Sequence, residues 1–272
     1  MQRFLRFPGW KCKAVTLSYD DAVVEDVRLI EIMKKYGLKG TFNVNSGLLG
    51  RAKRRMTVEQ AFNLYSGSGM EVAMHGYEHA YNESRTGADI IKEYYTDKVE
   101  LEKIFGKMMR GGAYPYGTYD DRVLAVLEVL GVNYFRTIEC THGFDIPTDW
   151  LRLKPTCWHS DEKLFDLVDE FLSRPVNKVY YAKPMLFYLW GHSYEFEDCN
   201  NWEIIEKFGQ KMSESEDIWH ATNIEIYDYV KAYNDLEFSC DGTRVINNSA
   251  IDVYLFKNGK NVLAKANSIS EI

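Results

Sequence analysis

Two pairs of residues have the types and the spacing of a site where a cation activates water. Asp20 and Asp21 are adjacent carboxylates, and His75 and His79 are separated by three residues. Imidazoles at positions i and i+4 of a helical turn face the same way and can bind one cation. One carboxylate could bind that cation while the other takes a proton from a bound water molecule. Because a carboxylate and two imidazoles leave coordination positions open, the set favours hydrolysis at a divalent ion.

Two further segments offer groups for the same chemistry. The segment Gly111–Gly117 contains glycines and a proline that force a turn, and backbone N–H groups in such a turn can donate to an oxyanion. His192 comes directly after an apolar run at 185–190, where it is well placed to act as a general acid.

Each group also has a structural alternative. The two aspartates could cap a following helix, and His192 could be a hydrogen-bonded structural residue. The histidine spacing could be coincidence, and Gly111–Gly117 could be a bare turn. A zinc-protease site is excluded, because that mechanism needs Glu directly after the first histidine and this sequence has Gly76 there.

Short apolar runs alternate with amphipathic segments around these groups. We predict strands at 14–19, 41–45, 70–75, 133–138, 185–190 and 218–221, and helices at 23–36, 57–65, 88–105, 119–130, 163–172, 201–212 and 224–233. About seven strand-then-helix units favour an α/β fold with a parallel sheet curled into a barrel. The candidate groups lie where predicted strands end, which is the face where barrels carry their active sites.

The pattern changes after Leu236. Alternating runs at 244–247, 251–257 and 261–266, with a hairpin turn at 257–260, predict a small β appendage. We therefore expect a catalytic barrel over residues 1–235 and a C-terminal β extension over residues 236–272, packed on the barrel.

Composition excludes several classes of protein. The 272 residues have a net charge of −7, and the basic run 51–55 is predicted to be a solvated loop, so nucleic acid is not expected as a partner. No apolar run approaches the ~20 residues that span a bilayer. The N-terminal segment lacks the apolar core of a signal peptide, and five cysteines without a C-x-x-C pair favour reduced thiols, so we expect a cytoplasmic protein.

Taken in order, the motifs resemble those of the polysaccharide deacetylases, carbohydrate esterase family four. The family's Thr-Phe-Asp-Asp-Gly resembles the segment 18–22, and its His-(Ser/Thr)-x-x-His resembles 75–79. Its Arg-x-Pro-Tyr-Gly resembles 113–117, and its Leu-x-His resembles 189–192, with one extra residue. The resemblance covers roughly residues 14–222 and implies a distorted (β/α)7 barrel.

The resemblance also implies roles for individual residues. Asp20 would be the general base, His192 would protonate the leaving group, and the backbone N–H of Tyr116 would help hold the oxyanion. Asp21, His75 and His79 would bind one divalent ion, zinc first, with cobalt, nickel or manganese as alternatives. Trp190, Arg136 and His159 are expected to contact the substrate.

Several residues depart from the family pattern and suggest a divergent subgroup. Ala113 stands where the family has an arginine that orients the base, and Arg110 and Arg136 are the candidates to replace it. Gly76 and Ala22 also differ from the family residues. The family's Asp-Trp motif is only loosely echoed by 145–150, and neither Asp145 nor Asp149 is given a role.

The leading hypothesis is a metal-dependent hydrolase that removes an acetyl or other acyl group from an N- or O-acetylated sugar or glycan through a metal-bound water. One alternative keeps the fold and the metal but hydrolyses a small cyclic or linear amide, as allantoinase-like relatives do. The other is a catalytically inactive glycan-binding barrel, to which the missing arginine gives some support.

Overall fold

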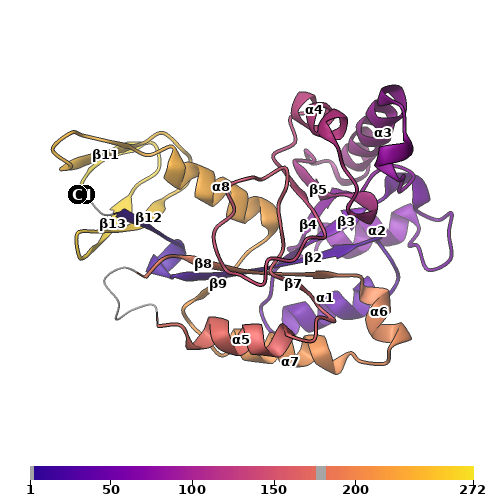
Figure 1. Ribbon diagram of the computed structural model, residues 1–272, viewed down its shortest axis with the longest axis horizontal. Helices are drawn as coiled ribbons and strands as arrows, with labels where there is room; N and C mark the ends of the chain where they lie inside the picture. Colours follow the sequence, from indigo (N-terminus) through magenta and orange to yellow (C-terminus); the bar gives the residue numbers. More distant parts are fainter. Residues whose placement is uncertain (1–2, 176–181) are drawn as a thin grey trace.

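The computed structural model describes residues 3–175 and 182–272, and a curled parallel sheet runs through its centre (Figure 1). The strands are hydrogen-bonded in the order β6-β5-β4-β3-β2-β8-β7, and β9 pairs with the start of β2. Their bounds are β2 Lys13–Asp20, β3 Gly40–Val44, β4 Glu71–Met74, β5 Gly111–Ala113, β6 Tyr134–Arg136, β7 Cys157–Trp158, β8 Met185–Gly191 and β9 Ile218–His220. Every pairing in this sheet is parallel. The predicted α/β fold is confirmed as a half-barrel of the (β/α)7 type.

Helices lie on both sides of this sheet (Figure 1). They are α1 Asp26–Lys35, α2 Val58–Ser66, α3 Gly87–Phe105, α4 Asp121–Val129, α5 Leu164–Ser173, α6 Ser193–Asp198, α7 Glu203–Ser213 and α8 Asn223–Asn234. In Figure 1, α1, α5, α6 and α7 lie along one side of the sheet and α8 crosses the other. In the described parts of the chain, no helix combines the length and apolar character needed to cross a bilayer.

The strand that carries the two aspartates lies in the middle of the sheet. All eight residues of β2 are buried, because the strand pairs with β3, β8 and β9 and is packed on both faces. Side chains alternate along it: Leu17 and Tyr19 join the apolar layer beneath the helices, while Ser18 and Asp20 point into the half-barrel. The end of β2 therefore holds its side chains in a fixed, largely desolvated place.

The C-terminal strands form two small antiparallel sheets. One has the order β1-β12-β13 and the other β10-β11-β14. Their bounds are β1 Arg3–Arg6, β10 Glu237–Phe238, β11 Arg244–Asn247, β12 Val253–Lys257, β13 Lys260–Ala264 and β14 Ser268–Glu271. The predicted hairpin at 257–260 is present, with Asn258 and Gly259 at positive φ as a tight turn requires. Sequence analysis did not predict that β1 pairs with β12; the domain boundary at 235/236 stays a prediction.

Tyr229 of α8 joins this β region to the barrel. Its hydroxyl donates to the Arg6 carbonyl at 2.9 Å and accepts from the Tyr254 amide at 2.9 Å. One buried phenol therefore links the helix to both β1 and β12.

Candidate metal and acid–base site

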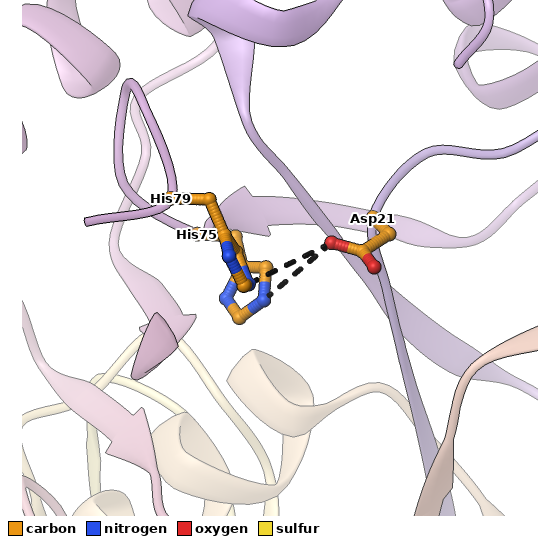
Figure 2. Close-up of side chains that lie close together, drawn as sticks. All are labelled: Asp21, His75 and His79. Atoms are coloured by element: carbon orange, nitrogen blue, oxygen red, sulfur yellow. Dashed lines mark ion pairs between the residues drawn. The ribbon is translucent and has the colours of Figure 1, made fainter. Parts of the chain in front are cut away.

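Asp21, His75 and His79 come together at the ends of β2 and β4 (Figure 2). The distance from Asp21 Oδ1 is 3.9 Å to His75 Nε2 and 3.8 Å to His79 Nε2. One ligand atom from each residue lies within 4.8 Å of the other two. Ligand atoms around a tetrahedral ion lie roughly 3.4 Å apart, so the two Asp21–histidine separations of 3.9 and 3.8 Å exceed that spacing by only a few tenths of an ångström.

The two histidines reach the site from a loop, which corrects the helical turn that their spacing suggested. Residues 75–80 are not helical, and the chain bends at Gly76 (φ 76°) and at His79 (φ 55°). A Cβ on Gly76 would lie 2.7 Å from Glu93 Oε1, which explains why no hydroxyl residue stands there. Glu93 of α3 accepts from the Glu78 and Ala80 amides and fixes the loop.

The tautomer of His75 suits metal binding. Its Nδ1 lies 2.8 Å from the Ala113 carbonyl oxygen, so Nδ1 carries the proton and Nε2 offers a lone pair to the site. That Nε2 is buried and has no hydrogen-bond partner. Burial is also the largest cause of the lowered pKa of His75, which keeps the ring neutral. An orphaned lone pair beside a second imidazole and a carboxylate is the donor set of a divalent ion such as zinc.

Arg55 is an unpredicted neighbour of Asp21. Its Nη2 lies 2.8 Å from Asp21 Oδ1, and its Nη1 donates to the Asp21 carbonyl and, at 3.2 Å, to Asn45 Oδ1. Only 12% of the side chain is exposed. The run 51–55 is therefore not a solvated loop throughout: its last residue fixes the backbone of a candidate ligand, a role that composition alone could not indicate.

Asp20 lies beside the metal-binding set without belonging to it. Its Oδ1 accepts from Asn43 Nδ2 at 2.8 Å, and its Oδ2 accepts from Arg136 and lies 3.7 Å from His75 Nε2. Burial acts to raise the pKa of Asp20, but the Arg136 guanidinium, with His75 and His192, holds it well below its usual range. Asp20 is thus an ionised carboxylate aimed at the candidate metal position.

Of the two candidates to replace the missing arginine, Arg136 is the one that binds Asp20. It stands level with Ala113 in the parallel register of β5 and β6, so the two side chains share a face of the sheet. The small Ala113 side chain leaves space for a guanidinium from the next strand. Arg110, the other candidate, instead binds Asp228 of α8 at 2.7 and 2.8 Å.

His192 faces Asp20 from the end of β8. Its Nε2 lies 4.0 Å from Asp20 Oδ2, and its Nδ1 lies 3.4 Å from Glu195 Oε1. Sequence analysis missed Glu195. The signal was available, because Glu three residues after a helix-capping residue is the pattern of a capping box, and His192 caps α6.

The turn after β5 carries Tyr116 to the same place. Tyr116 has φ 56°, and its ring packs edge-on against His79 with ring centres 4.3 Å apart. The Gly117 and Thr118 amides bond back to the Tyr114 and Pro115 carbonyls, which closes the turn. The segment predicted from its glycines and proline is therefore beside a candidate ligand.

The three predicted substrate contacts have different surroundings. Trp190 is partly exposed, and its ring stacks over the Arg136 guanidinium at 4.4 Å. Arg136 and His159 are each 1% exposed. His159 Nε2 lies 3.1 Å from Glu195 Oε2. These two side chains contact the candidate base and the partner of the candidate acid, beneath the surface that a substrate would reach.

Solved structures share this fold. A putative polysaccharide deacetylase from Mycobacterium smegmatis aligns with a TM-score of 0.62 at 16% identity, covering 85% of this chain and 94% of that one. BA3943 from Bacillus anthracis, a CE4 family pseudoenzyme, aligns with a TM-score of 0.51 at 15% identity, covering 82% of this chain and 68% of that one. The Streptococcus pyogenes deacetylase PplD aligns at 24% identity over 50% of this chain and 62% of that one, with a TM-score of 0.46, which is too low to establish a shared fold.

A comparison with curated proteins finds no match. The family model described as polysaccharide deacetylase matches residues 9–135, which contain the aspartate pair, both histidines and the turn at Tyr116. The resemblance carried by the ordered motifs is thereby confirmed. This segment, just under half of the chain, is similar to the polysaccharide deacetylase family.

Proposed function

We propose that the protein is a metal-dependent hydrolase that removes an acetyl group from an N- or O-acetylated sugar or glycan. The observation that carries the proposal is the convergence of one carboxylate and two imidazoles, with an unligated carboxylate on one side and a histidine beyond it. The match of residues 9–135 to the polysaccharide deacetylase family model supports the carbohydrate substrate.

Asp21, His75 and His79 are the residues that would hold the ion. Zinc suits two neutral imidazoles and one carboxylate, and cobalt, nickel or manganese could replace it. When bound, such an ion polarises the acyl carbonyl and lowers the pKa of water.

The acid–base steps belong to residues on either side of that position. Asp20 accepts the proton of the attacking water, because Arg136 keeps its carboxylate ionised and Asn43 fixes its orientation. His192 donates a proton to the departing amine or alcohol, and the Tyr116 amide donates to the oxygen that becomes negative. Trp190 offers an apolar ring to the sugar.

Metal analysis tests the proposal directly. We expect the purified protein to hold about one equivalent of a divalent ion, and Asp21→Ala and His79→Ala to lose it, because each removes one of three ligands. Asp149→Ala is a matched control, since Asp149 is exposed and bonds only within its own turn to Arg152. A wild-type protein without a stoichiometric ion, together with unchanged variants, would end the hydrolase proposal.

Turnover separates the reaction from its alternatives. We expect acetate release from acetylated sugars, and a loss on the order of 10²-fold or more in Asp20→Asn and in His192→Ala, with metal content retained. Ring opening of a cyclic ureide without acetate release would indicate the amidohydrolase instead. Tight sugar binding by the metal-loaded protein without turnover would indicate an inactive binding barrel.

A further inference from the structure

We propose that Glu195 is the positioning residue of the general acid, holding the His192 ring so that its Nε2 faces Asp20. This inference rests on the proposed function, in which His192 donates the proton to the leaving group. Glu195 belongs to none of the motifs that the resemblance is built on.

The start of α6 brings the two residues together. His192 directly follows β8 and caps α6, and Glu195 lies one helical turn further on. Glu195 Oε1 lies 3.4 Å from His192 Nδ1, and Glu195 Oε2 accepts from the His192 backbone amide at 3.3 Å. The carboxylate therefore contacts both the ring and the backbone of the same residue, which limits rotation of the imidazole. A proton on Nδ1 would face Glu195 and leave Nε2 toward Asp20.

Glu195 is itself held by β7 and the residue that follows it. Trp158 Nε1 donates to Oε2 at 3.0 Å, and His159 Nε2 lies 3.1 Å from the same oxygen. The His159 ring is fixed by packing, with its centre 4.1 Å from that of Phe196 and 5.7 Å from that of Tyr19. The Trp158 indole and the His192 amide therefore hold the carboxylate in place, as a positioning residue requires.

Glycine at position 191 permits this arrangement. A Cβ built on Gly191 would lie 2.1 Å from His159 Nδ1, closer than any real contact, so His159 packs directly on the backbone before His192. The extra residue between Leu189 and His192, compared with the family's Leu-x-His, is Gly191 or its neighbour Trp190. The extra residue in this segment is therefore compatible with the close packing of the buried His159 ring on its backbone.

Charges facing His192 favour its protonated form. Burial acts to lower its pKa, but the Glu195 carboxylate first, and then Asp20 and Asp21 at the end of β2, raise it above the ordinary value. The other titratable groups near the ring are His159, which opposes this when charged, and Tyr194, whose ring centre is 5.1 Å away. Burial would raise the pKa of Glu195, yet hydrogen bonds with His159 and His192 hold it well below its ordinary value.

The test removes the charge of Glu195 and changes nothing else in the side chain's shape. Glu195→Gln keeps the shape of the side chain, and Glu197→Gln removes one charge from the same helix, where Glu197 accepts from Trp202 instead. The pKa of His192 is measured in each full-length protein from the pH dependence of its ring NMR signals. Acetate release is followed across pH in parallel.

We expect Glu195→Gln to lower the His192 pKa by at least about one unit and Glu197→Gln to leave it unchanged. The rate kcat should fall on the order of tenfold or more, its alkaline limb should move to lower pH, and KM should stay within about twofold. Should Glu195→Gln fail to fold, Glu195→Asp keeps the charge and is expected to retain a raised His192 pKa.

An unchanged His192 pKa and pH profile in folded Glu195→Gln would overturn the inference. Failure of the proposed function looks different: wild-type protein would release no acetate, although the His192 pKa would still fall in Glu195→Gln. The NMR titration and the activity assay therefore distinguish the two failures.

Discussion

Three strands contribute to the surroundings of one carboxylate. Asp20 ends β2, Asn43 of β3 donates to its Oδ1, and Arg136 of β6 donates to its Oδ2. The guanidinium side chain has no exposed surface and lies under Trp190, so its charge is compensated almost wholly by Asp20. Such a buried pair fixes geometry more than it adds stability, because desolvation offsets the attraction.

Replacing Arg136 tests this orientation. Arg136→Lys keeps a positive charge but loses the planar fork and the stacking on Trp190, so we expect kcat to fall about 10²-fold through displacement of the base. Arg136→Met should also destabilise the fold, by about 3–5 kcal/mol, because Asp20 is left buried and unpaired. Kinetics and chemical denaturation measure the two effects.

Arg110→Met is the matched control for the arginine variants. Arg110 pairs with Asp228 at the surface, where removal of an ion pair costs about 0–1 kcal/mol. We expect wild-type turnover from this variant. Wild-type kcat in Arg136→Lys would show that the base needs no guanidinium.

The junction between β8 and α6 requires a glycine at position 191. Gly191→Ala would force a Cβ against the His159 ring, so we expect a loss of about 1–3 kcal/mol in the free energy of unfolding and a decrease in turnover. Gly67→Ala is the control, because a Cβ at Gly67, with φ −101°, meets nothing within 4 Å. Equal stability of the two variants in urea would mean that His159 moves aside freely.

The sequence predicts the longer elements and misses some of the shortest ones. Hydrophobic periodicity and helix-stop residues predicted β2 and α3 within one residue at each end. By contrast, β7 has two residues and α6 has six, too short for a period to be visible. The pairing of β1 with β12 was missed because long-range pairing leaves no trace in a local pattern.

The residues of the candidate site that belong to local sequence motifs could be predicted. Asp20, Asp21, His75 and His79 stand at strand ends, where a parallel fold brings them together. Arg55 was not found, because it reaches the site through tertiary contacts, and Glu195 was missed although its spacing from His192 fits a capping box. The role of Arg136 needed the register of β5 and β6, which placed it beside Ala113.

Stability should depend on pH through three buried carboxyls. Burial raises the pKa of Asp26, Glu71 and Asp97 to about 7 in each case. A raised acid pKa means that the folded state binds the proton more tightly than the unfolded state does. The contribution is therefore fully present below the unfolded pKa near 4 and is lost as pH rises to about 7.

Asp26→Asn isolates one of these groups. Asp26 accepts from Tyr65 at 2.6 Å and from Ser193 at 2.5 Å, and hydroxyls can reorient to bond an amide. Between pH 5 and pH 8 we expect the wild type to lose about 2–3 kcal/mol more than the variant. The exposed Asp121→Asn is the control, and parallel stability curves for wild type and Asp26→Asn in denaturant titrations would contradict the prediction.

The pairing of β1 with β12 has a consequence for biosynthesis. Arg3 lies opposite Lys257, so the first described strand leaves the ribosome about 250 residues before its partner exists. During that interval β12, the partner strand of β1, has not been synthesised, although the strands of the half-barrel can already pair with one another. Translation should thus produce an assembled half-barrel before β12 is available to pair with β1.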